Sequence, residues 1–129
     1  VFAMMDGKQR KMALLGKSRG EQGTKTVALS GKKHGLPGIP VSELSSDQKG
    51  QVRKTMADLL AMFREKDAQE ALKMVDAGGF DHLHLAFYKN HDVGNDKIWD
   101  VWQIEGPNCL WFFRGDPHVH AWVNIKSPV

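Results

Sequence analysis

The apolar residues of this chain repeat with a helical period before Gly78 and Gly79 and with a strand period after them. Before the two glycines, apolar side chains recur every three or four residues, which places them on one face of an α-helix. After them, short apolar runs alternate with turn residues, which is typical of β-strands joined by short connections. Since 129 residues have room for one core, this order predicts a single domain of the α+β class, residues 1–129, with helices first and a sheet afterwards.

Residues 41–79 form the helical region of this prediction. A helix is expected from Ser46 to about Arg64, because Ser45 and Gln48 stand at the spacing of a capping box. A second helix follows, for which Asp67 is the expected cap and the two glycines are the ending. One apolar stripe of the first helix is expected to cover the sheet, and it consists of Val52, Met56, Leu59, Leu60 and Phe63.

Residues 1–40 are basic and rich in loop-forming residues, with eight Lys or Arg against two Asp or Glu. We expect a short helix within residues 1–15, with Asp6 as its N-cap, and one short strand from Thr24 to Leu29. A basic segment of this kind can bind nucleic acid, but it lacks the interleaved aromatic residues of a single-strand binder. We therefore expect no nucleic-acid partner.

Residues 80–125 are expected to form a four-stranded antiparallel meander, because the segments between the strands are short and rich in turn residues. The longest apolar runs, such as Cys109 to Phe113, are far shorter than the ~20 residues of a membrane span, so no transmembrane segment is predicted. Cys109 is the single cysteine, which excludes an internal disulfide and a cysteine-rich zinc site. The expected strands are Phe80 to Tyr88, Ile98 to Glu105, Cys109 to Arg114 and His118 to Ile125.

Two His-x-His units, His82 with His84 and His118 with His120, lie in the first and last of these strands. Side chains two apart on a strand share a face, so each unit presents two imidazoles to one side. In the last strand we expect Val119, Ala121, Val123 and Ile125 on the core side and the histidines on the other. Paired imidazoles at this spacing indicate a metal site, whereas the structural alternative is a pair of polar strand residues.

A metal site needs three or four ligands, and the first and last strands of an open meander lie about 14 Å apart. All four histidines therefore converge only if the sheet curls toward a barrel or has another strand order. Otherwise His118 and His120 need other partners, and the candidates are His34, His91, Asp100 and Glu105. With His118 and His120 as ligands, His120→Ala is expected to lower metal occupancy and His34→Ala is not.

The four tryptophans, Trp99, Trp102, Trp111 and Trp122, lie in the C-terminal third of the chain. Core packing explains most of them. Trp99 and Trp102 are an odd number of residues apart, so one is expected on the histidine face. Together with Trp122, a tryptophan there, taken as Trp102, would form the aromatic wall of a cofactor or metal site.

The C-terminal third also carries the sequence Trp102 to Pro107, then Leu110 with Trp111, then Pro117 to Trp122. This combination resembles a family of domains of unknown function, numbered 3500, whose members have an aromatic-x-Ile-x-Gly-Pro strand, an apolar strand and a closing His-x-His strand. The resemblance covers roughly residues 41–125. It departs at Pro117, where many members have Asn, and at Val123 with Asn124, which replace an Arg-Asp pair.

Members of that family are usually longer, and many are exported, so the resemblance implies a C-terminal fragment or processed subunit of a periplasmic or secreted protein. The partner is then another protein chain or the preceding half. No signal peptide pattern is visible in the chain, which begins with Val1. The family's function is not known, so the resemblance implies an architecture and no reaction.

Two functions from different classes follow. The first is a metal-binding protein, with an oxidoreductase subunit as one version, in which His118 and His120 are the ligands and His82 and His84 complete the site. Imidazole ligands without thiolates suit copper, which is expected first, and iron or zinc next. The second is a non-catalytic structural or interaction module that docks onto a partner. A hydrolase is disfavoured, because no Ser or Cys stands in a nucleophile motif.

Overall fold

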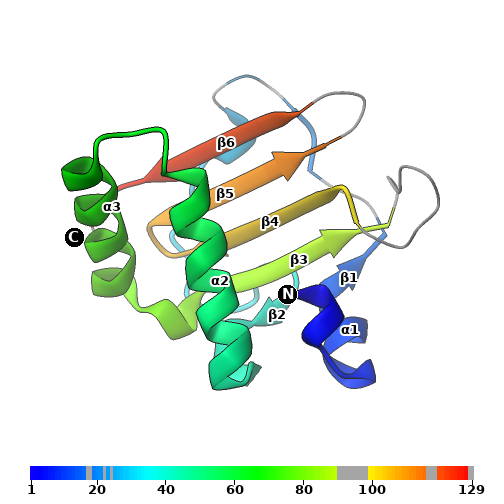
Figure 1. The fold of residues 1–129 in the computed structure, drawn as a ribbon. Helices are drawn as coiled ribbons and strands as arrows, with labels where there is room; N and C mark the ends of the chain where they lie inside the picture. The colour runs from blue at the N-terminus through cyan, green and yellow to red at the C-terminus, as the bar shows by residue number, and fades with distance from the viewer. Residues whose placement is uncertain (17–18, 22, 24, 90–98, 116–118, 128–129) are drawn as a thin grey trace.

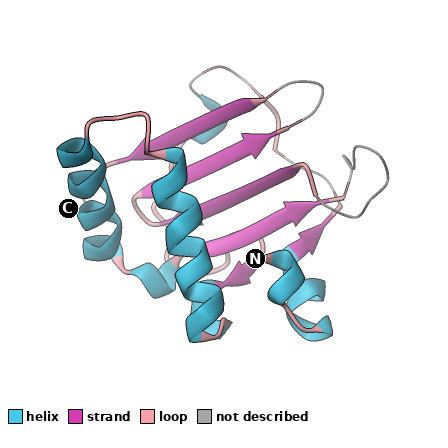
Figure 2. Cartoon of the chain, viewed as in Figure 1, coloured by secondary structure: helices cyan, strands magenta, loops and turns pink. Residues whose placement is uncertain are grey.

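The computed structural model describes residues 1–16, 19–21, 23, 25–89, 99–115 and 119–127. Three α-helices lie on one side of a mixed sheet, and the chain between β1 and β2, blue to cyan in Figure 1, passes along the other side. Figure 2 shows the same two layers by secondary structure. The α+β class predicted from the sequence is confirmed. The helices are α1 (Gly7–Ala13), α2 (Ser46–Leu59) and α3 (Glu65–Gly78); the strands are β1 (Leu14–Leu15), β2 (Ile39–Pro40), β3 (His84–Tyr88), β4 (Val101–Gly106), β5 (Cys109–Arg114) and β6 (His120–Ile125).

The strands β3, β4, β5 and β6 form the predicted antiparallel meander, with each strand hydrogen-bonded to the next. The prediction of four strands was wrong, because β1 pairs parallel with β3 and β2 pairs antiparallel with it at the same edge. Each added strand has only two residues, too few for a period of two to show in the sequence. The sheet runs in the order β1-β3-β4-β5-β6 and is open, so it does not curl into a barrel.

Two capping boxes begin helices where the sequence predicts them. The Asp6 carboxylate accepts a hydrogen bond from the backbone N–H of Gln9, and the Ser45 hydroxyl accepts one from Gln48. In both boxes the glutamine side chain accepts a hydrogen bond in return from the backbone N–H of the capping residue. The predicted cap Asp67 instead lies in the first turn of α3, where it pairs with the Arg64 guanidinium.

The apolar stripe of α2 is buried against the sheet only as far as the helix continues. Met56 and Leu60 are almost fully buried, but Phe63 is 54% exposed, which corrects the prediction that it packs on the sheet. The reason is that α2 ends at Leu59 and not near Arg64, so the helical period no longer holds at Phe63.

Two glycines allow close packing around the start of β3. Gly38 has a positive φ of 97°, and a Cβ there would lie 2.1 Å from the Leu85 carbonyl oxygen, so only glycine lets β2 approach β3. Gly79 ends α3 with a φ of 101°, as its predicted role requires, and a Cβ there would lie 2.6 Å from the His82 ring.

The two sheet faces carry separate apolar clusters. The helix-covered face includes Leu85, Ile104 and Trp111, which pack with α2 and α3. The loop-covered face includes Ala86, Leu110 and Phe112, which pack with Val27 of the chain between β1 and β2. The names helix-covered face and loop-covered face are used for them below.

Two further predictions are wrong, one about the expected strand at residues 24–29 and one about the core residues at the start of β6. In the expected strand Thr24 to Leu29, the described residues Lys25–Val27 form a 3-10 helix, which packs on the loop-covered face and does not join an edge. Val119 and Ala121 are exposed and not in the core, because α2 and α3 cover only the other end of β6, where Val123 and Ile125 pack.

Candidate functional site

The predicted metal ligands are divided between distant parts of the sheet. His84 is the first residue of β3 and only 4% exposed, and His120 is the first residue of β6. His82 lies in the 3-10 helix Phe80–His82, ahead of the strand, so the alternation of a strand does not relate it to His84. His118 lies outside the described residues, and the site of His118 with His120 stays a prediction.

The structure does not bring His84 and His120 together, although both lie on the loop-covered face. β4 and β5 separate their strands, and three strand spacings amount to about 14 Å. The two residues also lie at different levels, because His84 is opposite Glu105 and His120 is opposite Arg114. This separation is too large for one ion, whose bonds to imidazole nitrogens are ~2.0–2.1 Å long.

Trp102 and Trp122 lie on opposite faces, so the expected aromatic wall of the histidine site does not form. Trp102 packs on the helix-covered face and stacks on Phe113, with ring centroids 5.3 Å apart. Trp122 lies on the loop-covered face, where it stacks on Phe112 at 5.3 Å and contacts the His120 ring at 5.4 Å. Trp99 also packs with the cluster of the helix-covered face, so neither Trp99 nor Trp102 joins the histidines.

A buried polar cluster lies on the loop-covered face at β4. The guanidinium of Arg19 donates to Gln103 Oε1 at 3.0 Å, to Glu105 Oε1 at 3.1 Å and to the carbonyl oxygen of Thr26 at 2.6 Å. Gln103 also donates to Glu105 at 3.2 Å. Arg19 thus links the basic N-terminal region to β4 through Glu105, a carboxylate that is only 3% exposed.

Burial shifts the pKa values of Glu105, Tyr88 and His84 on the loop-covered face in the directions expected when a charged form loses its hydration. Burial raises the pKa of Glu105, while the neighbouring Arg19 opposes the shift. Burial raises the pKa of Tyr88 to about 12. Burial lowers the pKa of His84, and the charges of the nearby His34 and His82 rings lower it further. The hydrogen bond to the His82 backbone carbonyl acts in the opposite direction and raises this pKa.

Three histidines gather where the chain enters β3. The rings of His34 and His82 meet edge to face with centroids 5.5 Å apart. Nδ1 of His84 lies 3.0 Å from the carbonyl oxygen of His82, so Nδ1–H donates to it and Nε2 is left with its lone pair. The pairing of β2 with β3 places the loop that carries His34 beside this entry.

His120 has different surroundings. Its Nδ1 lies 3.0 Å from the Arg114 guanidinium, which also forms an ion pair with Glu21. A guanidinium beside an imidazole nitrogen disfavours a metal cation at that nitrogen. The two ends of the loop-covered face therefore differ, since the three-histidine end has two contacting imidazole rings, whereas at the other end the Arg114 guanidinium occupies Nδ1 of His120.

Sequence reasoning missed Arg19 and could not rank His34. Both lie in the loop-rich N-terminal region, where no periodicity indicates which way a side chain points. The signal available in the sequence was Gly38 followed by Ile39 and Pro40, a glycine before a short apolar pair, which the structure uses to dock that region on β3.

Within the described ranges, no group of three or more His, Cys, Asp or Glu side chains is placed so that it could hold a metal ion without rearrangement, and this includes His34, His82 and His84. No described helix has both the length and the apolar character needed to cross a membrane. Comparison of the chain with models of protein families, with curated proteins and with solved structures gave no significant match.

Proposed function

We propose that this chain is a metal-binding domain whose ligands are His34, His82 and His84 at the entry to β3. The observation that carries the proposal is the contact between the His34 and His82 rings. With metal–nitrogen bonds of ~2.0–2.1 Å, two imidazoles on one tetrahedral ion have ring centroids roughly 5 Å apart. The centroid distance of 5.5 Å is close to that value.

His84 is the proposed third ligand. Its ring is held by the hydrogen bond from Nδ1 to the His82 carbonyl, which is the arrangement that orients metal-binding histidines in proteins. Binding requires His34 to move toward the other two rings. His34 is exposed on a loop, so this adjustment disturbs little packing. A water molecule or a substrate group would take the fourth position.

Copper is the first candidate for the metal. Three imidazoles without a thiolate suit copper, zinc and iron, and copper binds most tightly in the order of divalent ions. A redox-active copper with an open position would be consistent with an oxidoreductase subunit in an exported protein, which remains part of the proposal.

The test is titration of untagged, chelator-treated protein with Cu²⁺ and Zn²⁺, followed by calorimetry and elemental analysis. His34→Ala and His82→Ala are expected to lower the affinity at least about tenfold. His120→Ala is the matched control, because it removes the same side chain at the far edge of the sheet, and it is expected to leave the affinity unchanged. Wild-type protein that takes up neither metal would overturn the proposal, and so would a loss of binding in the His120 variant alone.

A second candidate, the non-catalytic interaction module, is favoured by one observation. Met62 and Phe63, at the connection between α2 and α3, are 83% and 54% exposed, and Phe63 lines a hollow with Val123 and Ile125. Apolar side chains gathered at such a hollow are typical of a docking surface. Size-exclusion chromatography tests it: wild type is expected to self-associate or to bind its partner, and Phe63→Ser to remain monomeric and unbound.

A further inference from the structure

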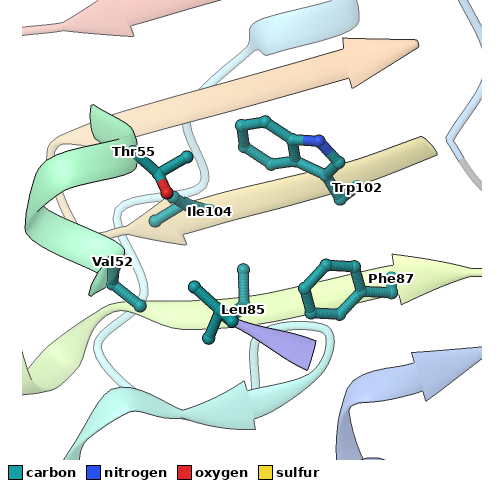
Figure 3. Close-up of a pocket in the computed structure, with 7 residues that line it drawn as sticks. Val52, Thr55, Leu85, Phe87, Trp102 and Ile104 are labelled. Carbon is teal, nitrogen blue, oxygen red and sulfur yellow. The ribbon is translucent and has the colours of Figure 1, made fainter. Parts of the chain in front are cut away.

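A groove runs along the helix-covered face between α2 and α1. Its inner end is a hollow of about 150 Å³ between α2 and the strands β3 and β4. Figure 3 shows Val52 and Thr55 of α2 on one side of this hollow, with Leu85, Phe87, Trp102 and Ile104 along the strands. Apart from the hydroxyl of Thr55, the side chains labelled there are apolar or aromatic.

The groove continues outward into a second hollow of about 530 Å³. The two hollows share Val1, Phe87 and Trp102. The outer one adds Phe2, Ala3, Arg10 and Trp99 to the lining. A volume of this size falls in the range of small-molecule sites, ~300–1,000 Å³. The groove is distinct from the histidine cluster, because the sheet lies between them.

The outer end of the groove is cationic. Arg10 lines both the second hollow and the adjoining surface, where Lys11 and Lys89 lie beside it. Arg10 donates to the carbonyl oxygens of Phe2 and Ala3, which leaves further N–H groups of its guanidinium for a ligand. No carboxylate is among the described residues that line these hollows.

The wall also contains a hydrogen-bond donor that lacks an acceptor. The indole N–H of Trp99 is buried and has no hydrogen-bond partner in the described structure. An unsatisfied buried donor is costly, and natural proteins contain few of them. An oxygen of a bound anion near Arg10 and Trp99 would be positioned to satisfy it after a small shift of the ring.

From the apolar inner end and the cationic outer end, we propose that the groove binds an amphipathic carboxylate, with the tail between Thr55 and Trp102 and the carboxylate beside Arg10 and Lys89. The aliphatic tail replaces water against Phe87 and Trp102, which supplies the affinity, and the cations fix the orientation. This inference does not depend on the proposed metal site.

The test uses decanoate as the probe and decan-1-ol as its uncharged counterpart, with calorimetry and tryptophan fluorescence as readouts on the full chain. Thr55→Phe fills the inner hollow and is expected to weaken decanoate binding at least tenfold. Ala57→Phe adds the same ring at an exposed position of α2 outside the groove and is expected to leave binding unchanged. A thermal melt of each variant separates loss of binding from loss of folding.

The double variant Lys11→Gln with Lys89→Gln is expected to weaken decanoate about three- to tenfold and decan-1-ol not at all. Lys66→Gln with Lys73→Gln, at two exposed positions on α3, is the control for the same change in net charge. The proposal is overturned if decanoate does not bind, if Thr55→Phe binds it as wild type does, or if the alcohol binds as tightly as the acid.

Discussion

Replacing Arg19 with Met tests whether the N-terminal region is held on the sheet by a buried charge pair. The substitution keeps an apolar stem of similar reach and removes the guanidinium that donates to Gln103, Glu105 and the Thr26 carbonyl. Among the described residues, Glu105 then keeps the hydrogen bond from Gln103 and the weaker influence of the Lys32 charge. Breaking a buried pair by removing one partner typically costs ~3–5 kcal/mol.

The expected loss is smaller than that and depends on pH. The Arg19 side chain is 23% exposed and that of Glu105 is 4% exposed, so water already screens part of the pair, and we expect a loss of about 2–3 kcal/mol at about pH 8. When the carboxyl takes up a proton, the ion pair no longer contributes, and the remaining loss is that of the guanidinium's hydrogen bonds to Gln103 and the Thr26 carbonyl, about 1.5 kcal/mol.

The sign of this pH dependence follows from the pKa of Glu105, which burial raises above its unfolded value. Such a group favours folding most at low pH, and its contribution is lost as the pH rises through the folded pKa. Without Arg19 the folded pKa of Glu105 rises further, so the variant should lose stability more steeply than wild type as the pH is increased.

Urea unfolding at about pH 5 and about pH 8 measures the two free energies. Arg64→Met is the matched control, because Arg64 pairs with Asp67 at the surface, and it should cost less than about 0.5 kcal/mol at both pH values. An Arg19 loss that is equal at the two pH values, or below 0.5 kcal/mol at both, would refute the account of a buried charge pair.

Three further predictions concern the core and the helix caps. Leu60→Ala should cost about 2–4 kcal/mol in urea unfolding and Phe63→Ala less than about 1, because the first side chain is buried and the second is half exposed; equal losses would contradict the placement of the end of α2. Ser45→Ala should cost about 1 kcal/mol, since the hydroxyl caps the Gln48 N–H, and an unchanged midpoint would show that the cap contributes nothing. Burial raises the pKa of Cys109 to about 12, so the folded protein should not react with a thiol reagent at about pH 8, whereas the urea-unfolded protein should; rapid labelling of the folded protein would contradict its burial.

The features predicted correctly from the sequence are those encoded by neighbouring residues. The capping box of Ser45 with Gln48 and the strand Cys109–Arg114 depend on local spacing, and the structure contains both as predicted. The end of α2 at Leu59 was not predicted, because the apolar stripe continues in the sequence to Phe63, which lies beyond that end and is half exposed.

The arrangement of the histidines could not be predicted from neighbouring residues either, because it depends on how the chain turns before β3 and on pairing between distant segments. Whether His82 belongs to a strand depends on Gly79, whose positive φ turns the chain through a 3-10 helix before β3. Whether His34 contacts His82 depends on the pairing of β2 with β3, two segments that are distant in the sequence. A strand of two residues leaves no pattern in the sequence from which this pairing could be predicted. Alternation correctly predicted that Val123 and Ile125 face the core, because that part of the prediction is local.

The central proposal is tested most directly by a copper titration of four proteins: wild type, His34→Ala, His82→Ala and His120→Ala. The sequence alone predicts that His120 is needed and His34 is not. The structure leads us to propose the reverse, with one copper bound per wild-type chain, at least tenfold weaker binding in the His34 and His82 variants, and unchanged binding in the His120 variant. Unchanged binding in the His34 and His82 variants, or no uptake by wild type, would contradict the proposal.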